Sequence, residues 1–247
     1  GPALLALGEA ERAEASYREA LRLDPAYVDG QINLANLLAK RGDLDVALDY
    51  YRSAVAAEPR RIEAHLGLAT ALFNSDHAPE ALTHIAMAIQ LDPRSAAARN
   101  LSGLAHRRCQ KYAEAVAQSR VAVALAPEET SYRENLAVAL VKTRRPECCD
   151  EAITIFRAIL EQDPDRLDSL LGIGSALVQN QQPLASLPYL ERALAVGGKQ
   201  IEALVNCAVP LTYAGRFEEA LRYCEEAITA APDDCLVLTH RGTVREC

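Results

Sequence analysis

Prolines placed at a fixed interval constrain the fold of this chain more than any other feature of its sequence. The interval is 34 residues along the first half, lengthens once to 37 and returns to 34, with a glycine at one of the places. The residues that mark it are Pro25, Pro59, Pro93, Pro127, Pro164, Gly198 and Pro232. A fixed period of this length indicates repeated supersecondary units, none of which buries its apolar face without a neighbour.

Each interval has the pattern of two amphipathic helices joined by a short turn. In residues 32–59, apolar residues recur every three or four places on both sides of Arg41-Gly42-Asp43. Gly42 can adopt the left-handed conformation that ends a helix, and we expect the Asp43 side chain to cap the helix that follows. Pro59 lacks a backbone donor and disfavours helix at the preceding residue, so the hairpin ends there.

The period and the helix–turn–helix unit resemble the tetratricopeptide repeat. Small residues stand where that family brings its helices close together. In the first helix of the unit these are Ala35, Ala69, Gly103, Ala137, Gly174 and Ala208. Early in the second helix they are Ala13, Ala47, Ala81, Ala115, Ala152, Ser186 and Ala220. The tryptophan common in the family's first helix is absent, and its place is taken by residues such as Gln31, His65 and Leu204.

The resemblance implies an all-α fold, a right-handed α-solenoid (superhelix) of stacked antiparallel helix pairs that spans residues 1–247 as one domain. We expect roughly 13 or 14 helices and no strand. The expected units are a partial unit 1–25, full units 28–59, 62–93, 96–127, 130–164, 167–198 and 201–232, and a partial unit 235–247. In the first partial unit, Gly8 is expected to separate two helices. Because both ends cut through a unit, we expect a segment of a larger protein whose ends fray or associate end to end.

Several units depart from the pattern. In the third full unit, Asn100 and Leu101 come one residue early, which predicts a rotated or shifted first helix. In the fourth, the extra residues fall in TRRPECCD, where we expect them to lengthen an exposed turn between the helices. In the last two, Pro188 and Pro210 lie inside helices and are interpreted as kinks, with a change of superhelix curvature as the alternative.

Composition and charge exclude several classes of function. The net charge of −8 argues against a general binder of nucleic acid or anionic membranes, since attraction to phosphate needs an excess of Lys and Arg. No apolar run approaches the roughly 20 residues that span a bilayer. We expect no signal peptide, and the opening Gly1-Pro2 is typical of a protease scar. The seven cysteines contain no CxxC pair, which favours reduced thiols and a cytoplasmic location. We expect Cys148 and Cys149 in an exposed turn, and Cys207 and Cys224 on packed helix faces.

No arrangement of residues indicates catalysis, a metal or a cofactor. Phosphate-binding glycine loops and the HExxH and GxSxG motifs are missing, and the histidines are scattered over different units. Cys235, His240 and Cys247 do not have the spacing of zinc ligands. His77 and His84 are interpreted as a solvated pair.

In the family that this chain resembles, first helices line a concave surface that holds peptides at the second, fifth, sixth, ninth, twelfth and thirteenth places of each unit. The residues at the sixth place include Asn33, Gly67, Asn135, Gly172 and Asn206, with Asn100 one place early. Asparagine costs several tenths of a kcal/mol relative to alanine in a helix, and its amide can pair with an extended peptide backbone. The pattern is similar to the asparagine ladder of O-linked N-acetylglucosamine transferase repeat domains and to the repeats of the peroxisomal import receptor. The alternative is a solvated polar residue on an exposed face.

Charged residues form a second pattern on the same surface. Acids occupy the second place at Asp29, Glu63, Asp168 and Glu202. Bases occupy the twelfth or thirteenth place at Lys40, Arg107, Arg108 and Lys142. A groove with one acidic and one basic edge would follow, but the helix dipole favours the same distribution without a ligand. Asn36 and Tyr213 complete the candidates for peptide binding. The C-terminal tails of chaperones are not expected to bind, because the family's clamp for such tails needs lysines near the helix starts, where this chain has acids.

The sequence therefore predicts a protein–protein interaction scaffold that binds an extended peptide or partner protein in its concave groove. No catalysis, cofactor, nucleic acid or membrane insertion is expected. Two other functions stay open: the substrate-recognition repeat domain of a larger enzyme such as a glycosyltransferase, and a self-assembling structural protein. A transferase domain in sequence beyond Cys247 would support the first alternative. Light scattering, which detects self-association, would test the second.

Overall fold

The computed structural model describes residues 2–198, 201–232, 238, 241–242 and 244, and structural statements below refer to these residues. They form thirteen α-helices and no strand, which confirms the all-α prediction. The helices are α1 (Pro2–Leu23), α2 (Val28–Arg41), α3 (Leu44–Ala57), α4 (Ile62–Asn74), α5 (Ala78–Leu91), α6 (Ala96–Arg108), α7 (Tyr112–Leu125), α8 (Thr130–Lys142), α9 (Pro146–Gln162), α10 (Leu167–Gln179), α11 (Pro183–Gly197), α12 (Ile201–Tyr213) and α13 (Phe217–Ala230).

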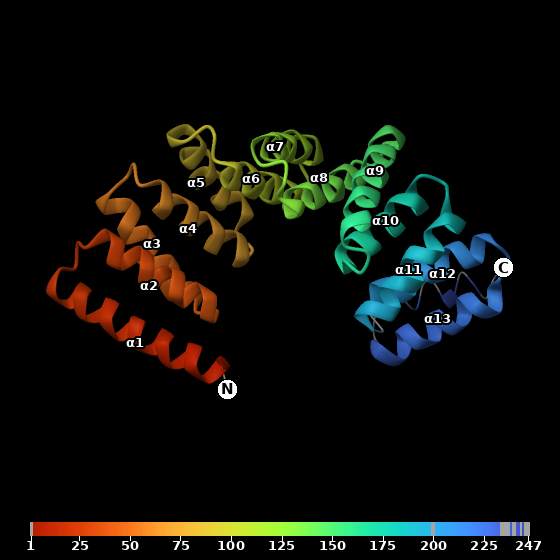
Figure 1. Ribbon diagram of the computed structural model, residues 1–247, viewed down its shortest axis with the longest axis horizontal. Helices are drawn as coiled ribbons and strands as arrows, with labels where there is room; N and C mark the ends of the chain where they lie inside the picture. The colour runs from red at the N-terminus through yellow and green to blue at the C-terminus, as the bar shows by residue number, and fades with distance from the viewer. Residues whose placement is uncertain (1, 199–200, 233–237, 239–240, 243, 245–247) are drawn as a thin grey trace. The chain divides into compact units, whose positions relative to one another are not determined.

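The helices group into two compact units, residues 1–126 with α1–α7 and residues 127–247 with α8–α13 (Figure 1). Within each unit, consecutive helices joined by short turns pack against each other as pairs, α2 with α3, α4 with α5 and α6 with α7, then α8 with α9, α10 with α11 and α12 with α13. Each unit is therefore a stack of helical hairpins, the predicted solenoid architecture. One solenoid running through residues 1–247 stays a prediction.

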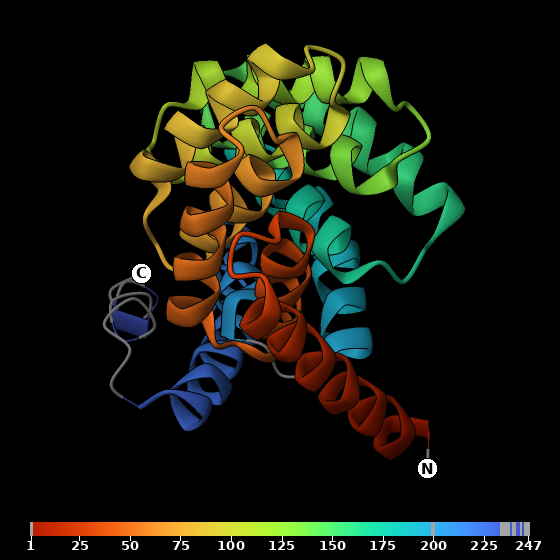
Figure 2. The ribbon, with the colours of Figure 1, turned by 90° about the vertical axis from the view of Figure 1, so that its left-hand side faces the viewer.

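The two helices of each hairpin form two layers. Consecutive first helices contact one another, α2 with α4 and α4 with α6 in the first unit, and α8 with α10 and α10 with α12 in the second. Consecutive second helices make no such backbone approach among the described residues. Each unit therefore curves with its first helices on the inner face. We call α2, α4, α6, α8, α10 and α12 the inner helices and the others the outer helices; Figure 2 shows the first unit from the end where α1 packs on α2.

Small residues hold the inner and outer helices close together, as the sequence predicts. Ala35 and Ala47 of the first hairpin are both 0% exposed. A Cβ added to Gly103 would lie 2.3 Å from the Ser119 hydroxyl oxygen, closer than packed atoms allow. Helix α6 begins at the first place of its unit, as α2 and α4 do, so the predicted shift of this helix at Asn100 is not seen.

The turn after each inner helix contains one residue in the left-handed region. Gly42 has φ 95°, and the backbone N–H groups of Gly42 and Asp43 donate to the carbonyls of Ala39 and Leu38 at 3.1 and 3.0 Å, which confirms the predicted helix end. The expected capping role of Asp43 is wrong, because its carboxylate pairs with Arg41 instead of with the first N–H groups of α3. The corresponding left-handed residues of the other turns are Asp76, Gln110, Arg144, Gln181 and Gly215.

Two predictions about helix boundaries are wrong. Helix α1 continues through Gly8, because one glycine weakens a helix by only about 1 kcal/mol and does not end it. The extra residues of the fourth full unit extend α9 to 17 residues and leave the turn before it short. Pro146 explains this, because a proline's fixed φ suits the first helical turn, where its missing N–H costs nothing.

The positions of the cysteines and internal prolines follow from these boundaries. Cys148 and Cys149 lie in the first turn of α9, half-buried and buried, so the expectation of an exposed turn is wrong. Cys207 and Cys224 are buried as predicted. Helices α11 and α12 continue through Pro188 and Pro210. The expected last partial unit falls mostly outside the described residues, and so do Cys235, His240 and Cys247.

Candidate functional site

A groove of about 610 Å³ lies between the inner helices α2 and α4 of the first unit. All but one of its lining residues belong to these two helices, and the exception, Tyr51, reaches in from the outer helix α3. The lining residues are Ile32, Asn36, Ala39, Lys40, Tyr51, Glu63, Leu66, Gly67, Thr70, Ala71 and Asn74. The groove combines apolar walls with amide, hydroxyl and charged groups, the composition expected of a recognition site.

Tyr51 reaches the groove because Gly67 leaves room for its ring. A Cβ at Gly67 would lie 2.2 Å from the ring carbon Cε1 of Tyr51, so no larger residue fits at this place of α4. The phenol hydroxyl donates to Oδ1 of Asn36 at 2.6 Å, a length typical of O–H···O bonds. Burial raises the pKa of Tyr51 to about 12, which keeps the phenol protonated and donating. Since Oδ1 is occupied, Asn36 offers its N–H donors to a ligand.

The second unit also has an aromatic ring packed beside a glycine of an inner helix, but this ring has no hydroxyl. A Cβ at Gly172 of α10 would lie 2.3 Å from Cζ of Phe156, which belongs to the outer helix α9. Val138 of α8 stands at the place that Asn36 has in α2. An aromatic hydroxyl is therefore present where the neighbouring inner helix has an asparagine, and absent where it has a valine.

Of the candidate peptide-binding residues, Asn36 and Lys40 lie together in this groove, and Glu63 and Gly67, from the second and sixth places, line it with them. Asn33 is exposed on α2, outside the groove lining. Asn135 and Asn206 are half-buried on their helices. The candidates on other inner helices are Asn100, Arg107 and Arg108 on α6, Asn135 and Lys142 on α8, and Asn206 and Tyr213 on α12. Their roles in binding stay predictions.

The two arginines at the end of α6 differ in their surroundings. Arg108 donates to the carbonyl oxygen of Phe73 at 3.0 Å, pairs with Asp76 at 3.0 Å, and lies over the Phe73 ring at 4.5 Å. These contacts close the end of α4, so Arg108 has a structural role. Arg107 is half-buried, and burial together with the charge of Arg108 lowers its pKa.

In the first unit, one arginine pairs with two acids of the predicted acidic edge. Arg61, which directly precedes α4, pairs with Asp29 of α2 at 2.6 Å and with Glu63 of α4 at 2.8 Å. Asp29 therefore links two consecutive hairpins through an arginine that the sequence pattern did not single out. The two carboxylates share one positive charge and stay exposed, at 51% and 64% of their side chains.

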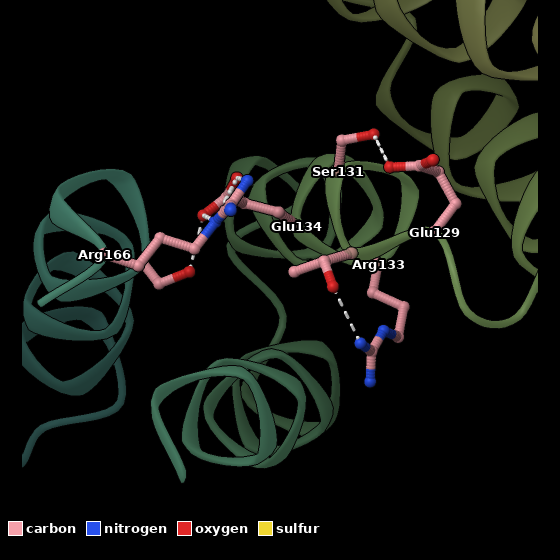
Figure 3. Close-up of polar contacts among 7 residues, drawn as sticks. Glu129, Ser131, Arg133, Glu134 and Arg166 are labelled. Atoms are coloured by element: carbon pink, nitrogen blue, oxygen red, sulfur yellow. Dashed lines mark hydrogen bonds and ion pairs between the residues drawn. The ribbon is translucent and has the colours of Figure 1, made fainter. Parts of the chain in front are cut away.

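A buried version of this link joins α8 and α10 in the second unit (Figure 3). Arg166 donates to both carboxylate oxygens of Glu134, at 3.0 Å from Nε and 2.9 Å from Nη2, and Ser169 donates to the same carboxylate. The bond to Glu134 raises the pKa of Arg166. Arg61 and Arg166 hold equivalent places, each directly before an inner helix. This recurrence is the sequence signal that would have identified the links.

Two further pockets lie on the outer side, between α1 and α3 with about 560 Å³ and between α9 and α11 with about 330 Å³. Both have an arginine, a leucine, a proline and a tyrosine at equivalent places of the repeat. These are Arg18, Leu21, Pro25 and Tyr50 in the first unit, and Arg157, Leu160, Pro164 and Tyr189 in the second. These outer pockets are the alternative ligand-binding surface to the inner groove.

None of the described helices has the length and apolar character needed to cross a membrane. Among the same residues, no group of three or more His, Cys, Asp or Glu side chains is arranged to hold a metal ion.

Comparison with known proteins places the chain in a family. One family model, the tetratricopeptide repeat, matches residues 1–62, 135–200 and 171–234, and a second model of the same description matches residues 38–105. The peroxisomal targeting signal receptor of Pichia angusta is 29% identical over 85 residues, which is 33% of this chain and 15% of the receptor. The match therefore spans only a small part of that receptor.

Solved structures share the fold at low sequence identity. A tetratricopeptide repeat protein from Parabacteroides merdae has a TM-score of 0.73 and 17% identity, covering 98% of this chain and 94% of that one. YrrB, described as a protein of this kind with an unusual peptide-binding site, has a TM-score of 0.63 and 22% identity over 76% of this chain and 95% of its own. PilW, a type IV pilus biogenesis factor, has a TM-score of 0.76 and 18% identity, covering 86% and 97%. Because the family models together match most of the sequence and the helical hairpins stack as that family requires, this chain belongs to the tetratricopeptide repeat family.

Proposed function

We propose that this chain is a protein-interaction module that binds an extended peptide segment of a partner protein along its inner helices. The groove between α2 and α4 is the proposed site in the first unit. The observation that supports it most is the agreement between the groove lining and the peptide-holding places of the family. Asn36 and Lys40 hold the ninth and thirteenth places of one repeat, and Glu63, Gly67 and Thr70 hold the second, sixth and ninth of the next.

The groups in the groove suit a peptide backbone. Asn36 offers N–H donors because Tyr51 occupies its carbonyl oxygen, and Lys40 lies one helical turn further along α2. Thr70 donates its hydroxyl to the carbonyl oxygen of Leu66 at 2.8 Å and keeps its oxygen as an acceptor. Donors on one wall and an acceptor on the other match the alternating carbonyl and N–H groups of an extended chain.

The names of two similar proteins support the same class of function. YrrB is described by its peptide-binding site, and the yeast protein is described as a receptor for a targeting signal. The proposal assigns no catalytic step to this chain. It places the chain in the cytoplasm, where the five described cysteines stay free thiols.

Paired threonine variants test the proposal. Peptides are selected on the parent chain from a random-sequence library displayed on phage, and the affinity of the best peptide is measured by fluorescence anisotropy. Thr70→Arg places a long cation in the groove, whereas Thr83→Arg makes the same change at an exposed site on the outer helix α5. We expect Thr70→Arg to weaken binding at least tenfold, about 1.4 kcal/mol, and Thr83→Arg to leave it unchanged. Equal affinity of the Thr70 variant and the parent would refute the proposed site.

A further inference from the structure

Two histidines from different helices of the first unit form a hydrogen-bonded pair that the sequence pattern does not indicate. His65 of α4 is 5% exposed, and its Nδ1 lies 3.1 Å from Nδ1 of His84 on α5. The other ring nitrogen of His65, Nε2, lies 3.0 Å from the carbonyl oxygen of Pro59 in the turn before α4. His65 therefore joins α4 both to its hairpin partner and to the preceding repeat. The earlier interpretation of His84 as a solvated partner of His77 is wrong.

The contacts determine where the protons of the neutral pair lie. A carbonyl oxygen only accepts, so Nε2 of His65 carries a proton and donates to Pro59. Nδ1 of neutral His65 is then an acceptor, and Nδ1 of His84 must donate to it. The proton of neutral His84 is thus on Nδ1, and its Nε2 is the one ring nitrogen of the pair that can gain a proton without loss of a hydrogen bond.

Acid affects this pair in two steps. The first proton goes to Nε2 of His84, and the bond between the two Nδ1 atoms persists with a cationic donor. A second proton must go to Nδ1 of His65, where it would face the N–H of His84 across 3.1 Å. Two donors at that distance repel, so the doubly protonated pair has to separate.

Charged side chains from α3 and α5 act on His84. Arg52 of α3 and Glu80 of α5 both act on His84, and they pair with each other at 3.3 Å. Burial lowers the pKa of His84, His65 and Arg52 lower it further, and Glu80 raises it. His84 therefore binds a proton more weakly in the folded chain than a free imidazole does.

The preceding repeat achieves the same anchoring without a titratable group. Gln31 has the place in α2 that His65 has in α4, and its Nε2 donates to the Pro25 carbonyl oxygen at 2.7 Å and to the Ser53 hydroxyl at 3.0 Å. Anchoring alone thus does not require a histidine. The histidines add dependence on pH.

We propose that His65 and His84 form an acid-sensitive latch, which holds α4 against α5 and against the turn at Pro59 and opens when both rings are protonated. The stabilisation is complete above the ordinary imidazole pKa of about 6.5 and is lost as the pH falls below that value, because the open form then binds more protons. For each proton that the open form binds and the closed form does not, the opening constant rises about tenfold per unit fall in pH.

Hydrogen exchange of α4 amides between pH 7.5 and pH 5, corrected for the intrinsic effect of pH, tests the latch in the parent chain. We expect the opening constant to rise at least tenfold over this range. His65→Gln, which copies Gln31, should flatten the dependence while the melting midpoint at pH 7.5 stays near that of the parent. His77→Gln removes an exposed histidine before α5 and should leave the full dependence. Equal pH dependence of His65→Gln and the parent would overturn the proposal.

Nitrogen NMR of the parent gives a second test that does not depend on a variant folding. Long-range ¹H–¹⁵N spectra at pH 7.5 should show the proton of His65 on Nε2 and that of His84 on Nδ1. Both protons on Nε2 would exclude the proposed bond between the rings and with it the latch.

Discussion

At the scale of single residues, Tyr51 has two roles in the groove. Its ring fills the space beside Gly67, and its hydroxyl holds the amide of Asn36. Phe156 fills the corresponding space beside Gly172 with no hydroxyl, which shows that the ring packs well on its own. The hydroxyl is therefore assigned to the groove and the ring to the fold.

Tyr51→Phe separates these roles. We expect the free energy of unfolding in urea to fall by only about 0.5–1.5 kcal/mol, the usual contribution of one hydrogen bond. Binding of the phage-selected peptide should weaken several-fold, because the amide of Asn36 is no longer held. Tyr50→Phe, at the neighbouring position on the outer side, is the control and should change neither quantity. A Tyr51→Phe variant with unchanged affinity would show that the hydroxyl does not orient a ligand-binding group.

The sequence predicts residues whose roles follow from the repeat pattern and misses those whose roles depend on one particular side chain of another helix. Ala35 and Ala47 were identified because a close helix approach admits only small side chains at those places. The sequence gives no reason why Gly67 holds a sixth place where other repeats have asparagine, whereas the structure shows that the ring of Tyr51 from the preceding repeat excludes a side chain there. The hydrogen bond from Tyr51 to Asn36 joins residues 15 apart in the sequence, and the periodic pattern does not predict it.

At the scale of helices, arginines that directly precede inner helices connect consecutive hairpins. The pair of Arg166 and Glu134 is largely buried, with side chains 33% and 10% exposed. Arg192, inside the outer helix α11, pairs with Asp165 in the turn before α10, and this pair is solvated, with side chains 51% and 63% exposed. Arginine–carboxylate pairs are thus present in two environments within one unit.

Glu134→Ala should destabilise the chain by about 2–4 kcal/mol, near the low end of the range for broken buried pairs, because Arg166 would lose its partner in a partly buried site. Arg192→Ala is the matched control and should cost less than about 1 kcal/mol, since solvated pairs contribute little. Urea unfolding of both variants measures the difference. A cost for Glu134→Ala as small as that of the control would show that the link between α8 and α10 is not important for stability.

Helix boundaries were predicted well where a turn has a strong local signal and poorly where it does not. Gly42 marks the end of α2 in the sequence and in the structure. The turns that contain Asp76, Gln110, Arg144 and Gln181 adopt the same left-handed conformation without glycine, so no residue type marks them in the sequence. The three extra residues before the second helix of one repeat lengthened that helix, since Pro146 starts a helix as readily as it interrupts one.

At the scale of the whole molecule, the period of the sequence determines the fold class. Repeated hairpins can bury their apolar faces only by stacking, so the stacked pairs of helices follow from the spacing and the apolar pattern, whereas the layer order was expected from the family resemblance. The ligand does not follow from it. The sixth-place asparagines are distributed over α2, α8 and α12 and share no pocket that the structure describes, whereas Asn36 and Lys40 share one.

The most direct test of the proposed function is to locate a bound peptide on the chain. The phage-selected peptide is titrated into ¹⁵N-labelled protein, and changes in the amide spectra of assigned residues are recorded. We predict that the largest changes in the first unit occur at Asn36, Lys40 and Thr70, on the two walls of the inner groove. Changes centred on Tyr50 and Ser53, with the inner groove unaffected, would place the ligand on the outer helices and contradict the proposed function of the groove.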